Sequence, residues 1–113
     1  MITTERGKEG EDLACQYLES EGHEVVCRNF RNRLGEIDII SKKHDFIFFI
    51  EVKYWETNLI TPLEVFTKKK IGIMRKLAEY FFYSNPNYSK NFFVSFCLLD
   101  IKKDRIQFHR DLF

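Results

Sequence analysis

The run Phe46-Ile47-Phe48-Phe49-Ile50-Glu51-Val52-Lys53 decides the fold of this chain. It has the length of a strand and is rich in aromatic and β-branched residues. Bulky apolar side chains fall on both of its faces. Because a strand that is apolar on both faces is normally buried on both, the sequence predicts a central strand covered by helices.

A second strand precedes it, Gly35-Glu36-Ile37-Asp38-Ile39-Ile40, followed by polar, turn-like residues 41–45. A hairpin that turns near residues 43–46 places Asp38 opposite Glu51, and alternation puts Lys53 on the face of Glu51. Charges in an apolar strand pair are costly unless they are paired or bind a metal. A structural ion pair of Lys53 with Asp38 or Glu51, an outward-facing polar row and a Mg²⁺ site all remain open, since Mg²⁺ typically needs only one or two carboxylates.

A helix is predicted before these strands. Thr3 or Thr4 caps its start, and Gly22 ends it as a left-handed residue after the last turn. Glu11 lies on the edge of the apolar stripe of this helix. The residue is therefore either a solvated charge or a group that reaches the acidic strand pair.

A second helix is predicted after the central strand. Thr61 is its N-cap, Pro62 its first residue and Glu64 completes a capping box. Lys70 lies in the middle of the inward stripe, where it either extends to solvent or reaches the acids. Gly72 indicates a local break or close packing.

The remaining strands are predicted at residues 24–30, 91–101 and 105–109. The order of helix, three strands, helix and two strands indicates an α/β fold, a five-stranded mixed sheet flanked by helices. At 113 residues the chain is expected to be a single domain, 1–113.

The net charge of +1 excludes a global positive field, so a nucleic-acid partner must meet a local basic patch. Two basic runs qualify: residues 28–34, with Arg28, Arg31 and Arg33, and residues 67–77, with Lys68 and Lys69. Such runs are usually solvated surface. They are also what contact with a phosphate backbone requires.

Three cysteines, an odd number with no metal-ligand spacing, indicate reduced thiols. The three histidines fall in separate elements and receive no role. The N-terminus lacks the apolar core of a signal peptide, and no run approaches the ~20 apolar residues that span a bilayer. We expect a cytoplasmic protein without a membrane partner.

The motifs together resemble a known family. Asp38 followed by Glu51-Val52-Lys53 resembles the PD-(D/E)XK nuclease signature. The longer pattern resembles the YraN family of small bacterial proteins, which are similar to archaeal Holliday-junction resolvases. It consists of Gly7, Gly10-Glu11, Ala14, Tyr17-Leu18, Gly22, Arg28-Asn29, Gly35-Glu36-Ile37-Asp38, Ile50-Glu51-Val52-Lys53, Lys70 and Ala78.

The resemblance implies a restriction-endonuclease-like fold and a Mg²⁺- or Mn²⁺-dependent endonuclease that acts on DNA, including branched DNA such as Holliday junctions. It implies that Asp38, Glu51 and the Val52 carbonyl bind the metal and that Glu11 completes the acidic cluster. Lys53 would then orient or deprotonate the attacking water, and Lys70 would steady the phosphate. Arg28, Arg31, Arg33, Lys68 and Lys69 are the expected nucleic-acid contacts.

Two departures from the family pattern keep an alternative open. Trp55 stands where relatives commonly carry a basic residue, and Ser95 stands near a position where an acid is often seen. The alternative is a non-catalytic nucleic-acid-binding or protein-interaction module on the same fold. Junction-resolving relatives work as two-fold dimers, so a homodimer is also expected by resemblance.

Overall fold

The structure, a computed structural model, describes residues 4–55, 62–88, 91–102 and 105–113. Two long helices and five strands form it, together with one short helix and one 3₁₀ turn. In chain order these are α1 (Thr4–Ser20), β1 (Glu24–Asn32), β2 (Gly35–Lys43), β3 (Phe46–Trp55), α2 (Pro62–Val65), α3 (Lys68–Ser84), η1 (Pro86–Tyr88), β4 (Phe93–Lys102) and β5 (Arg105–His109).

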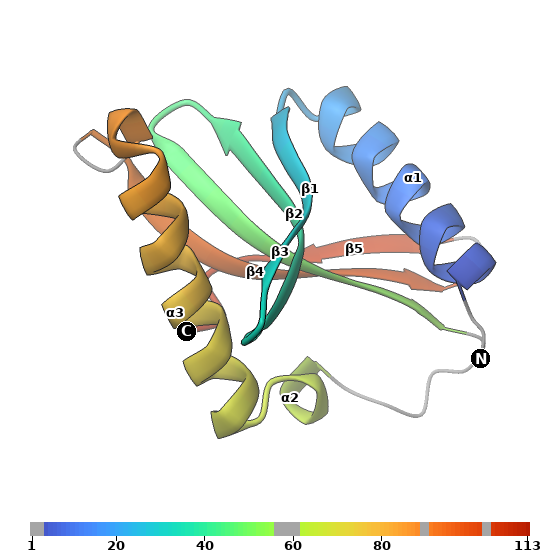
Figure 1. Cartoon of the computed structure of the whole chain (residues 1–113). Helices are drawn as coiled ribbons and strands as arrows, with labels where there is room; N and C mark the ends of the chain where they lie inside the picture. The colour runs from blue at the N-terminus through green and yellow to red at the C-terminus, as the bar shows by residue number, and fades with distance from the viewer. Residues whose placement is uncertain (1–3, 56–61, 89–90, 103–104) are drawn as a thin grey trace.

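The five strands form one sheet in the order β1-β2-β3-β4-β5, with β3 at its centre. Neighbouring strands are antiparallel except β3 and β4, which are parallel and are joined by the crossover that contains α3 (Figure 1). The predicted five-stranded mixed sheet and the central position of the Phe46–Lys53 run are confirmed. The strand predicted at residues 105–109 has those bounds, whereas β1 extends two residues beyond the predicted end.

A helix covers each face of the sheet, so two apolar cores form (Figure 1). On the α1 side, Ala14 and Leu18 pack against Phe48 and Ile50 of the central strand. On the α3 side, a second cluster is built from Ile47, Phe49, Met74, Leu77 and Phe81. Successive side chains of β3 point alternately into the two cores, so apolar residues occupy both faces of this strand. Each large apolar side chain that is fully buried there contributes roughly 1.5–3 kcal/mol to the stability of the fold.

The end of α1 follows the prediction. Gly22 has a φ of 91°, and the His23 N–H returns to the Leu18 carbonyl at 2.9 Å. Glycine has no Cβ to oppose this left-handed turn, which is why the helix stops here. Thr4 is the first helical residue, and Thr3 lies outside the described residues.

The second predicted helix is wrong at its start. Pro62 does begin a helix, but this is the four-residue α2, and Thr61 lies outside the described residues. The long helix α3 begins after Thr67, whose side-chain hydroxyl accepts a hydrogen bond from the Lys70 N–H at 3.1 Å. Because the long helix begins after Thr67, Lys70 lies in the first turn of α3 rather than in the middle of a longer helix.

Two glycines are used differently. Gly72 does not break α3: the helix is continuous there, and a Cβ at this position would meet open space. At Gly35, a Cβ would lie 2.7 Å from Cγ2 of Ile73, so the start of β2 needs glycine to pack under α3. No helix among the described residues has the length and apolar character that crossing a membrane requires.

Candidate functional site

The sheet divides at the point where the predicted acidic residues stand. Pairing of β2 with β3 runs from Lys43 opposite Phe46 to Ile39 opposite Ile50. Pairing of β3 with β4 continues to Trp55, and the start of β2 remains paired with β1. Between the diverging strands lies a hollow of about 210 Å³, which we call the acidic hollow. Its lining is Gly7, Gly10, Glu11, Asp38, Glu51, Val52, Lys53 and Tyr54.

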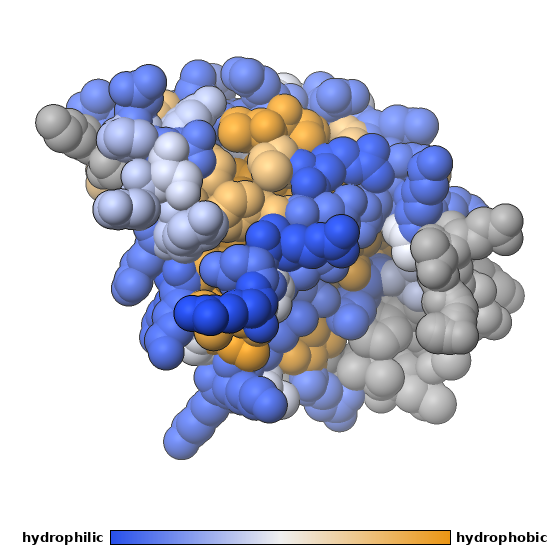
Figure 2. Space-filling model, viewed as in Figure 1, coloured by the Kyte–Doolittle hydropathy of each residue, from blue (hydrophilic) through white to orange (hydrophobic). Residues whose placement is uncertain are grey.

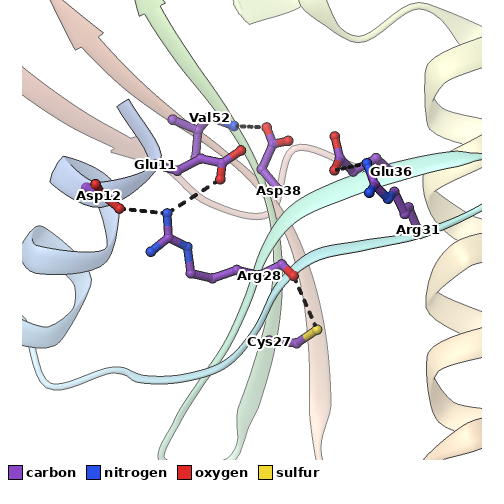
Figure 3. A network of polar contacts seen from close by, with 8 residues as sticks. All are labelled: Glu11, Asp12, Cys27, Arg28, Arg31, Glu36, Asp38 and Val52. Atoms are coloured by element: carbon purple, nitrogen blue, oxygen red, sulfur yellow. Dashed lines mark hydrogen bonds and ion pairs between the residues drawn. The ribbon is translucent and has the colours of Figure 1, made fainter. Parts of the chain in front are cut away.

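Where β2 and β3 separate, the Asp38 side chain takes the place of a backbone hydrogen-bond acceptor. Its Oδ2 accepts a hydrogen bond from the Val52 N–H at 2.8 Å, in the place where a β2 carbonyl would continue the ladder (Figure 3). Burial, and then the negative charge of Glu51, raise the pKa of Asp38 to about 7 against the opposing effect of this hydrogen bond. The charges of Glu11 and Glu36 make smaller contributions to the same raised pKa. Negative charge is therefore concentrated at this point.

Glu51 is held between two lysines. Its side chain is 7% exposed; Oε1 lies 3.0 Å from the Lys70 Nζ, and Oε2 lies 3.4 Å from the Lys53 Nζ. Of the two ion pairs that the sequence left open for Lys53, the pair with Glu51 is present, and Lys70 reaches the same carboxylate from α3. A buried carboxylate is tolerated because both of its oxygens have cationic neighbours.

Glu11 approaches from the helix on the other side. Gly10 allows this close approach, since a Cβ there would lie 3.2 Å from the Tyr54 Cβ. One Glu11 oxygen lies 3.5 Å from Nη2 of Arg28, and the same nitrogen donates a 2.8 Å hydrogen bond to Asp12 Oδ1 (Figure 3). That hydrogen bond is the main reason why the pKa of Arg28 is raised.

A second hollow, of about 610 Å³, adjoins the first; we call it the basic hollow. It is lined by Gly7, Lys8, Glu11, Arg28, Asn29 and Arg31, and so shares Gly7 and Glu11 with the acidic hollow. Strongly hydrophilic residues gather over β1 on the face that Figure 2 shows. The predicted contacts Arg28, Arg31 and Arg33 on and after β1 are exposed. Arg33 lines neither hollow, nor do the exposed Lys68 and Lys69 of α3.

Sequence reasoning assigned no role to Glu36. It lies on β2 two residues before Asp38, and its carboxylate is 4.0 Å from Nη1 of Arg31 (Figure 3). Burial, followed by the charge of Glu11, raises the pKa of Glu36. Strand alternation alone was a usable signal, because residues two apart share a face.

Asn29 was also missed as a structural feature. It adopts a φ of 55° within β1, between the pairs Arg28–Ile39 and Phe30–Ile37, and so lies across from Asp38. Asparagine tolerates this left-handed conformation better than most residues. The resulting irregularity in β1 lies beside the basic hollow, which Asn29 lines.

A buried polar group lies on β4. Asp100 is 3% exposed; its Oδ2 is 3.5 Å from the Lys102 Nζ and 3.8 Å from Nε2 of His109. In the described part of the chain, Asp100 Oδ1 and His109 Nε2 are buried without a hydrogen-bond partner. Nothing in the sequence pattern distinguished Asp100, because a single acid near a strand end is normally solvated.

The acidic side chains are not a preformed metal cage. Among the residues that the structure describes, no three Asp, Glu, His or Cys side chains are grouped closely enough to hold a metal ion as they stand. The donors available are carboxylate oxygens, which suit hard cations, and the charge concentrated at Asp38 is what such a cation would relieve. The donor chemistry therefore fits Mg²⁺ or Mn²⁺, provided that the lysines release Glu51.

The fold and the hollows together define an α/β protein with a five-stranded mixed sheet, split at its centre beside a cluster of acids and lysines. Residues 10–106 match the uncharacterised protein family UPF0102, and the chain belongs to this family. It is 41% identical to a UPF0102 protein of Leptospira interrogans over 96% of this chain and 94% of that one. It is 39% identical to one from Campylobacter jejuni subsp. doylei over 88% and 85%, and 41% identical to one from Syntrophomonas wolfei over 77% and 76%. The resemblance to the YraN family is confirmed as membership of UPF0102. The resemblance to PD-(D/E)XK nucleases stays a prediction.

Proposed function

We propose that the acidic hollow is the active centre of a Mg²⁺- or Mn²⁺-dependent endonuclease of the PD-(D/E)XK type that hydrolyses phosphodiester bonds of DNA. One observation carries the proposal: Glu11, Asp38, Glu51, Val52 and Lys53, from one helix and two strands, line a single hollow at the point where the sheet divides. A purely structural cluster does not require an open hollow between the strands.

Asp38 and Glu51 would hold the metal, with Glu11 and the Val52 carbonyl completing the oxygen donors. A bound divalent cation would supply Lewis-acid activation of water and offset the charge that develops on the phosphate. The raised pKa of Asp38, about 7, favours cation binding over protonation only at neutral pH and above. Metal affinity is therefore expected to increase with pH through this range.

The lysines have roles that suit their positions. Lys53 lines the hollow, where its ammonium would orient the attacking water. Lys70 would move from Glu51 to a non-bridging oxygen of the phosphate as the carboxylate becomes a metal ligand. Both groups are already adjacent to Glu51, so no large movement of the backbone is needed.

The basic hollow supports DNA as the substrate. Lys8, Arg28 and Arg31 offer cations beside the acidic hollow, and such residues bind the phosphate backbone by displacing condensed counterions. Branched DNA such as Holliday junctions, and a homodimer acting on it, remain part of the proposal. Sedimentation with and without a four-way junction would measure the assembly.

The test compares wild type with Asp38→Asn and with Arg105→Gln, an exposed position on β5, as the surface variant. Purified protein is incubated with linear, flapped and four-way DNA in Mn²⁺, Mg²⁺ or EDTA. Cleavage that requires metal, disappears in Asp38→Asn and persists in Arg105→Gln would support the proposal. Equal cleavage by Asp38→Asn would assign the activity to another site or another protein.

A non-catalytic nucleic-acid-binding or protein-interaction module is the alternative, and the double lysine pairing of Glu51 favours it. In that case Glu51 has a structural role and no metal binds. Calorimetric titration with Mn²⁺ distinguishes the two: saturable binding lost in Glu51→Gln supports the enzyme, and the absence of binding in wild type supports the module.

A further inference from the structure

Arg28 connects the two hollows. Its guanidinium lines the basic hollow, donates a 2.8 Å hydrogen bond to Asp12 and lies 3.5 Å from Oε1 of Glu11. The Arg28 side chain is 36% exposed, so a ligand in the basic hollow can reach it. The same group is thus placed to pair with protein carboxylates or with a phosphate.

Glu11 lies at the boundary between the two hollows. Its side chain is 16% exposed and lines both of them, and its charge contributes to the raised pKa of Asp38 on one side while it pairs with Arg28 on the other. Figure 3 shows the Glu11 carboxylate with one oxygen joined to Arg28. In the free protein, this pairing competes with any role of Glu11 in the acidic hollow.

We propose that Arg28 is a substrate-responsive latch on Glu11. A phosphodiester that enters the basic hollow draws Arg28 away from Glu11 and Asp12, and Glu11 is then free to act as an oxygen donor in the acidic hollow. This inference rests on the proposed function, because it requires both a divalent cation and a nucleic-acid strand. Binding of the strand would then tighten binding of the cation.

The energetics allow the exchange. A partly exposed ion pair contributes little to stability, so it is easily exchanged for another partner. A phosphodiester offers Arg28 two non-bridging oxygens, and the planar guanidinium group binds such a pair well. Because the coupling of two ligands is reciprocal, the strand and the cation must tighten each other by the same factor.

The expected factor is modest. Release of Glu11 from a partly exposed ion pair corresponds to a gain of up to about fivefold in affinity. The probe is a phosphorothioate-linked thymidine octamer, which resists hydrolysis. Calorimetry measures Mn²⁺ affinity with and without it after subtraction of Mn²⁺ binding to the octamer alone, and fluorescence anisotropy measures octamer affinity with and without Mn²⁺.

Four variants isolate the latch. Arg28→Gln should bind Mn²⁺ about threefold more tightly without the octamer and should show no coupling. Arg105→Gln removes the same charge from an exposed position on β5 that lines neither hollow and should keep the wild-type coupling. Asp12→Asn, compared with Glu19→Gln on the same helix, should bind the octamer severalfold more tightly in EDTA, because Arg28 has lost one of its partners.

The outcomes separate the two proposals. Coupling in wild type that is lost in Arg28→Gln and kept in Arg105→Gln supports the latch. Wild type that binds Mn²⁺ and the octamer independently overturns the latch while leaving the proposed function intact, and so does full coupling in Arg28→Gln. Wild type that does not bind Mn²⁺, with or without the octamer, overturns both.

Discussion

The Nζ atom of Lys70 lies 3.0 Å from Oε1 of Glu51 and joins the first turn of α3 to the central strand. The contact depends on Thr67, which begins the helix three residues before Lys70. It also depends on β3, which carries Glu51 just past the last residue paired with β2. The first turn of α3 and the central strand thus meet at one buried carboxylate.

The two lysines at Glu51 should contribute unequally to stability. Lys70→Met removes the shorter contact, 3.0 Å against 3.4 Å for Lys53, and leaves a buried carboxylate with one cationic neighbour. We expect it to lower the free energy of unfolding by about 1–2 kcal/mol, and Lys53→Met to lower it by less. Urea denaturation at pH 7 measures both, with the exposed Lys68→Met as the control. A larger loss in Lys53→Met would contradict this ranking.

Asp38→Asn should stabilise the metal-free protein at high pH. The pKa of Asp38 is raised from 3.8 to about 7, so this group favours folding below pH 4 and progressively loses that effect as the pH rises to 7. At ~1.4 kcal/mol for each pH unit, the wild type loses a few kcal/mol across this window. Asparagine still accepts the Val52 hydrogen bond without carrying the charge.

The measurement for Asp38 is thermal denaturation in EDTA at pH 5 and pH 8. The gain from Asp38→Asn should be larger at pH 8 than at pH 5, and addition of Mn²⁺ at pH 8 should stabilise wild type alone. An Asp38→Asn protein that is less stable than wild type at pH 8 would show that the charge is not costly at this position.

His23 should make the protein sensitive to acid. It is 7% exposed, its Nδ1 lies 2.9 Å from the Ser41 hydroxyl, and its ring packs 4.7 Å from that of Phe48. Burial first, and then the charges of Lys43 and Arg110, lower the pKa of His23 from 6.5 to about 4. Neutral His23 therefore stabilises the folded state above pH 6.5, and this stabilisation, about 3 kcal/mol, is lost as the pH falls towards 4.

The test for His23 compares His23→Gln with His44→Asn, a change in the exposed β2–β3 turn. His23→Gln should be less stable than wild type at pH 7 because packing is lost, but its unfolding free energy should fall less steeply between pH 6.5 and pH 4. His44→Asn should keep the wild-type slope, since asparagine suits the φ of 54° at that position. Parallel slopes in all three proteins would mean that His23 is protonated in the native state.

Gly7 should matter for binding rather than for folding. It lines both hollows, and a Cβ there meets nothing within 4 Å, as at the exposed Gly72 of α3. Gly7→Leu and Gly72→Leu should each stabilise their helix by up to about 1 kcal/mol. Only Gly7→Leu places bulk between the hollows, and we expect it to weaken binding of an oligonucleotide severalfold in fluorescence anisotropy. Equal binding by the two variants would indicate that a strand does not pass over Gly7.

The fold was largely predictable because its signals are local. The doubly apolar run around Phe49 identified the central strand, Gly22 identified the end of α1, and alternation placed Glu51 and Lys53 on one face. The start of α3 was not predictable in this way, since Thr61 and Thr67 are both acceptable caps. Which of them begins the long helix depends on how α3 packs against the sheet.

What required the tertiary structure is the arrangement of charge around the hollows. The family pattern indicated that Glu11, Asp38, Glu51 and Lys70 belong together, but not that Glu51 is held by two lysines or that Arg28 pairs with Glu11 and Asp12. These contacts join α1, β1, β3 and α3, and no local preference specifies them. Residue order along the chain was enough for strands and helices, because backbone hydrogen bonds and side-chain alternation act over a few residues. The position of each charge was decided only by packing, because ion pairs depend on distances between elements that are far apart in the sequence.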